Sequence, residues 1–132
     1  MGGRRESQEY SVHLREPVHA AATATEERTV FVAPMAGRIR AVTVTSDIAV
    51  TGDNTNTTNM NIINKGAAGV GTTEIGNLDL TTGVNMVAFD EKNIPITATA
   101  LAEGDTVTLQ FEKVGTGVAI GPSMVTIDWE PL

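Results

Sequence analysis

The sequence contains no cysteine and only one tryptophan, one tyrosine and three phenylalanines among its 132 residues. Without cysteine, the chain has no disulfide framework, no thiolate metal ligand and no cysteine nucleophile. No apolar run approaches the roughly 20 residues of a transmembrane helix, so we expect no membrane partner. The first residues lack the apolar core of a signal peptide, so we also expect no secretory signal.

Basic residues are few as well, because 9 Lys and Arg stand against 16 Asp and Glu, a formal net charge of −7. Contacts to phosphates need clustered Lys and Arg, so this balance argues against nucleic acid as a partner. Residues 1–28 hold four basic and five acidic residues, whereas residues 29–132 hold five and eleven. This shift predicts two parts, an N-terminal arm at 1–28 and a β-domain at 29–132.

Threonine is the commonest residue, valine is abundant, and thirteen glycines supply turns. Thr and Val are stiff at χ1 and favour strands. Turn signals recur about every ten residues and predict eight to ten short strands. The expected fold class is all-β: a β-sandwich or a jelly-roll-like barrel with an N-terminal extended arm. The predicted strands are 29–32, 38–45, 60–63, 72–80 with a bulge at Gly76, 84–89, an irregular 94–101, 106–111 and 124–130.

The N-terminal segment carries its own strand signal. Tyr10, Val12 and Leu14 alternate with polar residues, which is the period of a half-buried strand. Two interpretations stay open: the segment is the first strand of the domain, or it is an arm that adds a strand to a partner's sheet edge. Basic side chains that precede it could pair with acidic groups on that partner. The candidate interface residues are therefore Arg4, Arg5, Tyr10, Val12 and Leu14.

Catalytic arrangements are weakly represented. His13 and His19 both lie in the N-terminal segment, and neither accompanies a nucleophile pattern, so both are interpreted as packing or surface residues. Asp128 and Glu130 share one face of the last predicted strand, opposite Trp129. A glycosidase needs such a pair in a cleft, but aromatics make up only 4% of the chain. We predict that the protein is not an enzyme and has no catalytic residues, and a small carbohydrate-binding β-domain is a remote alternative.

Metal and phosphate sites find no stronger support. Asp53, Asn54 and Asn56 offer oxygen ligands but lack the acidic density of a calcium loop, so they are interpreted as a polar turn. The glycine-rich segment 66–71 is not followed by the Lys–Ser/Thr pair of a phosphate-binding loop. It is interpreted as a hairpin loop. The prediction is therefore no metal and no cofactor.

Several stretches together resemble the small head decoration, or cement, proteins of tailed phages. The resemblance runs from Val30 to about Glu130 and rests on segments 31–37, 51–55, 62–66, 102–109 and 113–117. It implies a β-sandwich or jelly-roll-like domain that forms a homotrimer, binds the major capsid protein on the capsid exterior of the virion and bridges capsomers. It does not assign individual contact residues. Similar β-domains occur in phage tail and fibre proteins, so a tail or fibre module is the alternative.

Overall fold

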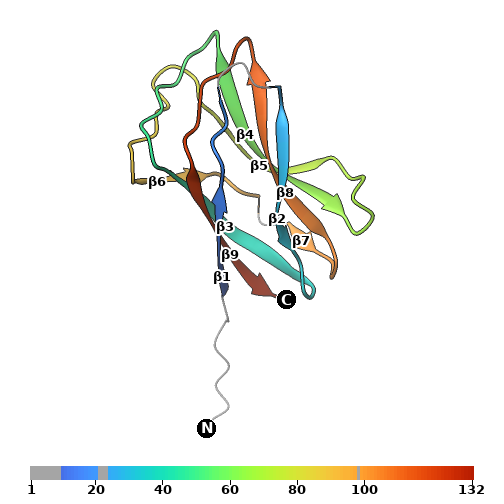
Figure 1. The fold of residues 1–132 in the computed structure, drawn as a ribbon. Helices are drawn as coiled ribbons and strands as arrows, with labels where there is room; N and C mark the ends of the chain where they lie inside the picture. Colours follow the sequence, from blue (N-terminus) through green and yellow to red (C-terminus); the bar gives the residue numbers. More distant parts are fainter. Residues whose placement is uncertain (1–9, 21–23, 98) are drawn as a thin grey trace.

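The computed structural model describes residues 10–20, 24–97 and 99–132 (Figure 1). Every regular element within these ranges is a β-strand, and no helix there is long and apolar enough to span a bilayer. The strands are β1 (Tyr10–Glu16), β2 (Glu26–Val32), β3 (Gly37–Ser46), β4 (Thr57–Gly66), β5 (Thr73–Asp79), β6 (Glu91–Ile94), β7 (Ala100–Leu101), β8 (Thr106–Val114) and β9 (Ser123–Pro131).

The strands form two antiparallel sheets that face each other. One sheet has the order β1-β9-β3-β6, with the short β7 also paired to β3, and the other has the order β2-β8-β4-β5. Leaving β7 aside, eight strands divide equally between two sheets, and along the full strand order every connection except β4–β5 and β6–β7 crosses from one sheet to the other. This arrangement is a double-sheet jelly roll, which confirms the predicted fold class.

The whole jelly roll is one long hairpin wound around the core. Its four nested ladders join β1 to β9, β2 to β8, β3 to β6 and β4 to β5. The residue numbers of paired positions add up to nearly the same value in every ladder: 139 for Tyr10–Trp129, 137 for Glu26–Phe111, 136 for Val42–Ile94 and 138 for Asn59–Asp79. The chain therefore folds back on itself near residues 68 and 69, within the β4–β5 turn.

The core lies between the two sheets and consists of aliphatic side chains with a few large rings. In β8, Val107, Leu109 and Phe111 are each at most 1% exposed, as their alternation with polar residues predicts. β9 contributes Val125 and Ile127 from the opposite sheet in the same way. Burying one side chain of this size stabilises the fold by roughly 1.5–3 kcal/mol, so these two central strands hold the layers together.

Most predicted strands are confirmed, but one is wrong. The irregular strand expected at 94–101 is present only in part, as the end of β6, an isolated bridge at Ile96 and the short β7. The bulge expected at Gly76 is present, because the β4–β5 register shifts between Ile62 and Ile63, opposite Gly76 and Glu74. Residues 84–89 do not form a strand: Met86 makes an isolated bridge to Val50, and the rest is loop. The segment is apolar except for Asn85, and a short apolar run of this kind does not by itself distinguish a strand from a loop that pairs with another loop.

The N-terminal segment pairs with its own domain as β1, in register with β9 over seven residues. This is the first of the two interpretations left open by the sequence, with Val12 and Leu14 packed against the core and Ser11, His13 and Arg15 exposed. β2 already begins at Glu26, inside the predicted arm 1–28. The division at residue 28 stays a prediction, and Arg4 and Arg5 lie outside the described residues.

The connections gather at the two ends of the sandwich. We call one end the long-loop end, where segments 47–56, 80–90 and 115–122 and the described parts of 17–25 lie. The other, the terminal end, holds segments 33–36, 67–72 and 102–105 together with Tyr10 and Leu132. Figure 1 shows the long loops at the top and the C-terminus at the bottom.

Candidate functional site

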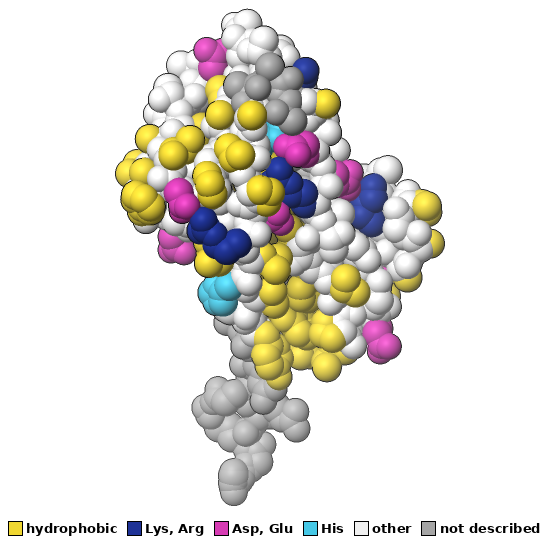
Figure 2. Space-filling view, viewed as in Figure 1, with side chains coloured by type: hydrophobic (Ala, Val, Ile, Leu, Met, Phe, Trp, Pro, Cys, Tyr) yellow, Lys and Arg dark blue, Asp and Glu magenta, His cyan; other side chains and the backbone are white. Residues whose placement is uncertain are grey.

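Large apolar side chains are exposed at both ends of the sandwich, and Figure 2 shows hydrophobic atoms gathered both on one flank of the upper half and at the lower end. A soluble surface with scattered single apolar residues is normal, but contiguous apolar patches mark interaction sites. We define two patches. We name the patches by the end of the sandwich at which their exposed residues lie: the terminal patch comprises Tyr10, Val32, Met35 and Leu132, and the loop patch comprises Ile48, Val87 and Phe89.

The terminal patch is built around β9. Tyr10 lies opposite Trp129 across the β1–β9 ladder, and their rings stack with centroids 5.2 Å apart. Trp129 also meets Phe31 of the other sheet at 5.4 Å. The amide of Leu132 donates to the carbonyl of Ala36 at 3.1 Å, which brings the C-terminus beside Met35. An exposed Tyr10 thus covers a buried aromatic pair.

The loop patch is built by two loops that continue the long hairpin beyond the sheets. Val50 and Met86 exchange two backbone hydrogen bonds of 2.9 Å, and the amide of Phe89 donates to the carbonyl of Ser46 at 2.8 Å. Ile48 lies midway between Ser46 and Val50, so this register brings it opposite residues 87 and 88. The three side chains are 44%, 65% and 76% exposed in the order Ile48, Val87 and Phe89.

The predicted interface residues of β1 divide between surface and core. Tyr10 belongs to the terminal patch, whereas Val12 and Leu14 are half-buried between the sheets. Polar contacts hold the strand in register: the Ser11 hydroxyl donates to Asp128 at 2.6 Å, and His13 Nδ1 lies 3.2 Å from the Thr126 hydroxyl. The interface role of Tyr10, Val12 and Leu14 stays a prediction, and the structure shows that β1 is an edge strand with one partner strand.

A charged cluster holds the β1–β2 crossover. His19 is 1% exposed, stacks on Phe111 and hydrogen-bonds through Nδ1 to Glu26. Arg28 lies over the same Phe111 ring and pairs with Glu26 at 3.2 Å and Glu16 at 3.9 Å. The bond to His19, with Arg28 nearby, lowers the pKa of Glu26, whereas burial raises the pKa of Glu16. His19 is thus a packing residue, as predicted.

The carboxylates considered for catalysis are engaged by neighbouring strands. Asp128 and Glu130 share the outer face of β9, as predicted, but Asp128 accepts from Ser11 and Glu130 accepts from Arg40 at 2.9 Å. Trp129 is 6% exposed and faces the core, so it offers no open ring to a sugar. The two carboxylates and the Trp129 ring therefore do not form a surface on which a sugar could bind.

The polar loop at Asp53 is a turn, as predicted. Asp53 Oδ1 accepts from the amides of Thr55 and Asn56, each at 2.7 Å, which is the pattern of an Asx turn. Asn54 exchanges two hydrogen bonds with Thr82 of the facing loop. Across the described ranges, no group of three or more His, Asp or Glu side chains is arranged to hold a metal ion.

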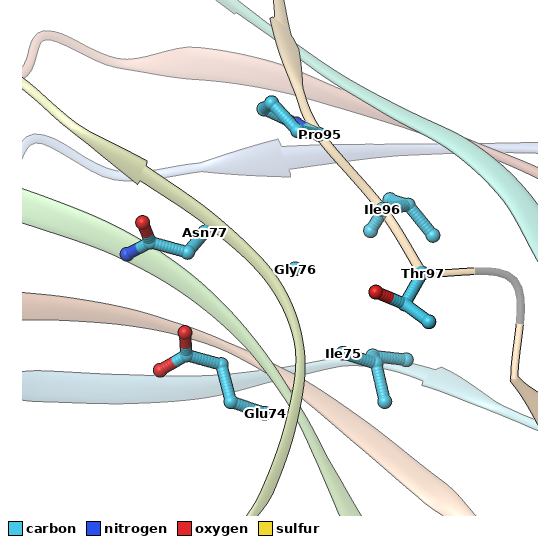
Figure 3. Close-up of a pocket in the computed structure, with 7 residues that line it drawn as sticks. All are labelled: Glu74, Ile75, Gly76, Asn77, Pro95, Ile96 and Thr97. Atoms are coloured by element: carbon cyan, nitrogen blue, oxygen red, sulfur yellow. The ribbon is translucent and has the colours of Figure 1, made fainter.

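One shallow pocket of about 280 Å³ lies where the open sides of the two sheets meet. Gly76 of β5 bridges Ile96, and a Cβ at Gly76 would come within 2.5 Å of the Ile96 side chain. In Figure 3 the side chains of Glu74 and Asn77 lie on the other side of β5 from Ile96 and Thr97. The volume falls just short of the usual range of roughly 300–1,000 Å³ for ligand sites. The pocket is therefore interpreted as a gap between the edges of the two sheets and not as a ligand site.

No family model and no curated protein matches this sequence. Among solved structures, the chain is similar to a chain of "Structure of infectious bursal disease virus Gx strain", with a TM-score of 0.38 and 8% identity over 94% of this chain and 33% of that one. A chain of "Structure of infectious bursal disease virus Gt strain" gives a TM-score of 0.29 and 9% identity over 94% and 42%. This chain spans about a third of the first of those chains, and such low TM-scores transfer no function.

The sequence did not reveal the loop patch. Phe89 and Val87 fall in the segment predicted as a strand, where alternating apolar residues are expected to be buried. One signal was present: Phe89 is followed directly by Asp90 and Glu91, and this abrupt change from apolar to acidic is unusual inside a core strand. The segment is a loop in which Met86 is buried in the core, whereas Val87 and Phe89 are exposed.

Proposed function

We propose that this chain is a structural virion protein that binds the exterior of a phage capsid through the major capsid protein. In this role it bridges capsomers as a homotrimer and stabilises the shell. The observation that carries the proposal is the presence of exposed apolar patches at opposite ends of one small domain. A bridging protein needs two separate contact surfaces, one for each neighbour, and it needs no pocket.

The fold and the charge are compatible with this function. Double-sheet jelly rolls are used by viral capsid domains, although lectins and cupins share the architecture, so the topology supports the proposal without deciding it. Most of the negative charge belongs to residues 29–132, which suits an outward, solvated surface. Many weak contacts repeated over a shell sum by multivalency, so each patch can be modest in area.

Reconstitution tests the proposal. Purified protein is mixed with capsids assembled without it, and occupancy and the temperature of capsid disruption are measured. We expect saturable binding and a higher disruption temperature. If the protein neither binds nor raises the disruption temperature, the proposal is wrong. The mass in solution tests the trimer, which should be about three times the 13.9 kDa of one chain.

Labelling intact particles separates the capsid function from the tail or fibre alternative. Antibody or gold label distributed over the head is expected for a capsid-binding protein. Label confined to the tail would instead favour a tail or fibre module.

A further inference from the structure

Phe89 has a backbone conformation that its side chain disfavours. Its φ is +63°, and it is the one non-glycine residue with positive φ in the described ranges. For a bulky side chain this left-handed region is a genuine outlier. Strain of this kind persists only where the surroundings impose it, and it clusters at functional positions. The same residue is 76% exposed, so the strain is not compensated by burial in the core.

The surroundings of Phe89 hold it rigidly. Its amide is bonded to Ser46 at the end of β3, and the amide of Asp90 donates to the carbonyl of Val87 at 3.2 Å. The facing loop is fixed to this one by the Val50–Met86 bridge. These bonds fix the backbone at Phe89, so little backbone entropy is lost when a partner covers the ring, and aromatic side chains are enriched at protein interfaces.

The charges around the loop patch are mainly acidic. Asp90 and Glu91 follow Phe89 directly and are exposed, and Asp47 precedes Ile48. Arg15 pairs with Asp47 at 2.8 Å and so neutralises one of these three carboxylates. Lys92 is a basic residue near the patch and follows Glu91 in β6. It is half-buried and lies opposite the buried Val44 in the β3–β6 ladder. A partner that is complementary to this patch therefore has basic residues around an apolar depression.

We propose that the loop patch is the docking surface for the capsid shell, with the Phe89 ring entering an apolar depression bordered by Lys or Arg of the shell protein. This inference rests on the proposed function and names the part of the chain that performs it. It assigns one of the two capsomer contacts to the long-loop end and leaves the terminal patch for the other.

Two substitutions at Phe89 test this docking surface. Phe89→Gly and Phe89→Asn both remove the ring, and both residues tolerate positive φ, so neither should lower the melting temperature. The matched control is Val70→Ser, because Val70 is 81% exposed at the terminal end and outside both patches. A fourth variant, Asp90→Asn with Glu91→Gln, removes the acidic border and leaves the apolar side chains in place.

Binding to capsids assembled without the chain is measured for all variants at low and high salt. We expect Phe89→Gly and Phe89→Asn to bind at least tenfold more weakly with an unchanged or higher melting temperature. Val70→Ser should bind within twofold of the original chain, and the Asp90/Glu91 variant should lose most of the salt dependence. Unchanged binding by both Phe89 variants would overturn this inference alone. A wild-type chain that does not bind overturns the proposed function and this inference with it.

Discussion

The paired loops of the long-loop end and the β4–β5 turn of the terminal end differ in how they are held. At the long-loop end, segments 47–56 and 80–90 are joined by the Val50–Met86 bridge and by a 2.8 Å bond from the amide of Gly52 to the side chain of Asn85. At the terminal end, the β4–β5 turn is closed by the bond from Gly71 to Lys65, and a Cβ at Gly69 would meet open space. The paired long loops present the Phe89 ring on a strained backbone, whereas the open β4–β5 turn presents only Val70.

A pair of glycine substitutions should show the largest difference in stability between the paired long loops and the β4–β5 turn. At Gly52 a Cβ would overlap the backbone carbonyl oxygens of Thr81 and Val84, so Gly52→Ala forces the two loops apart. We expect a loss of about 3 kcal/mol in the free energy of unfolding. A Cβ at Gly69 would have no atom within 4 Å, so Gly69→Ala is disfavoured only by the φ of +77°. We expect it to lower the free energy of unfolding by about 1 kcal/mol.

Urea unfolding of both glycine variants measures this difference. Equal losses at the two positions would show that the long loops are not held more tightly than the β4–β5 turn. The rigid presentation of Phe89 would then lose its physical basis, even if capsid binding were unaffected.

Low pH should change the stability of the long-loop end, because the β1–β2 crossover contains two glutamates whose pKa values are shifted. The pKa of Glu26 is lowered from its ordinary 4.5, mainly by the bond to His19 and further by Arg28. A lowered carboxyl pKa contributes stability above the unfolded value, and this contribution is lost as pH falls through the folded pKa. Glu16 acts in the opposite direction, because its pKa is raised by burial and its protonated form fits the folded state better.

Unfolding free energies measured between about pH 3 and pH 7 test this balance. Glu26→Gln should flatten the loss of stability below pH 4.5, the ordinary value of the glutamate pKa. Glu16→Gln should make that loss steeper, since it removes the group that gains from protonation. If Glu26→Gln leaves the acid limb unchanged, the His19–Glu26 contact does not couple the crossover to pH.

The sequence predicted the layers better than the loops. Alternation in β8 and β9 fixes which side chains are buried, because a one-residue slip would expose the whole apolar set. The glycine bulge in β5 was also predictable from Gly76. Residues 84–89 were not predictable as a loop, because a short apolar run looks the same in a strand and in a loop that pairs with another loop. The hydrogen bond that places Phe89 beside Ser46 joins residues far apart in the sequence, which local patterns do not reveal. The same limit applies to β1, whose pattern fits either its own sheet or a partner's.

The smallest expected effect comes from the ion pair at the border of the loop patch. Arg15 and Asp47 lie 2.8 Å apart, but their side chains are 53% and 36% exposed, so water and salt screen the attraction. The bond to Arg15 lowers the pKa of Asp47, but we expect so exposed a pair to add little to the stability of the fold. Arg15→Ala should therefore leave the urea midpoint unchanged.

Binding should respond to Arg15→Ala where stability does not. The substitution frees Asp47 and makes the border of the loop patch more acidic, which speeds association with a basic shell surface at low salt, and the gain disappears at high salt. Asp47→Ala should slow association under the same conditions while leaving the midpoint unchanged. If instead the two variants shift association in the same direction, the border charges act through loop conformation. The acidic border would then no longer account for the choice of a basic partner surface.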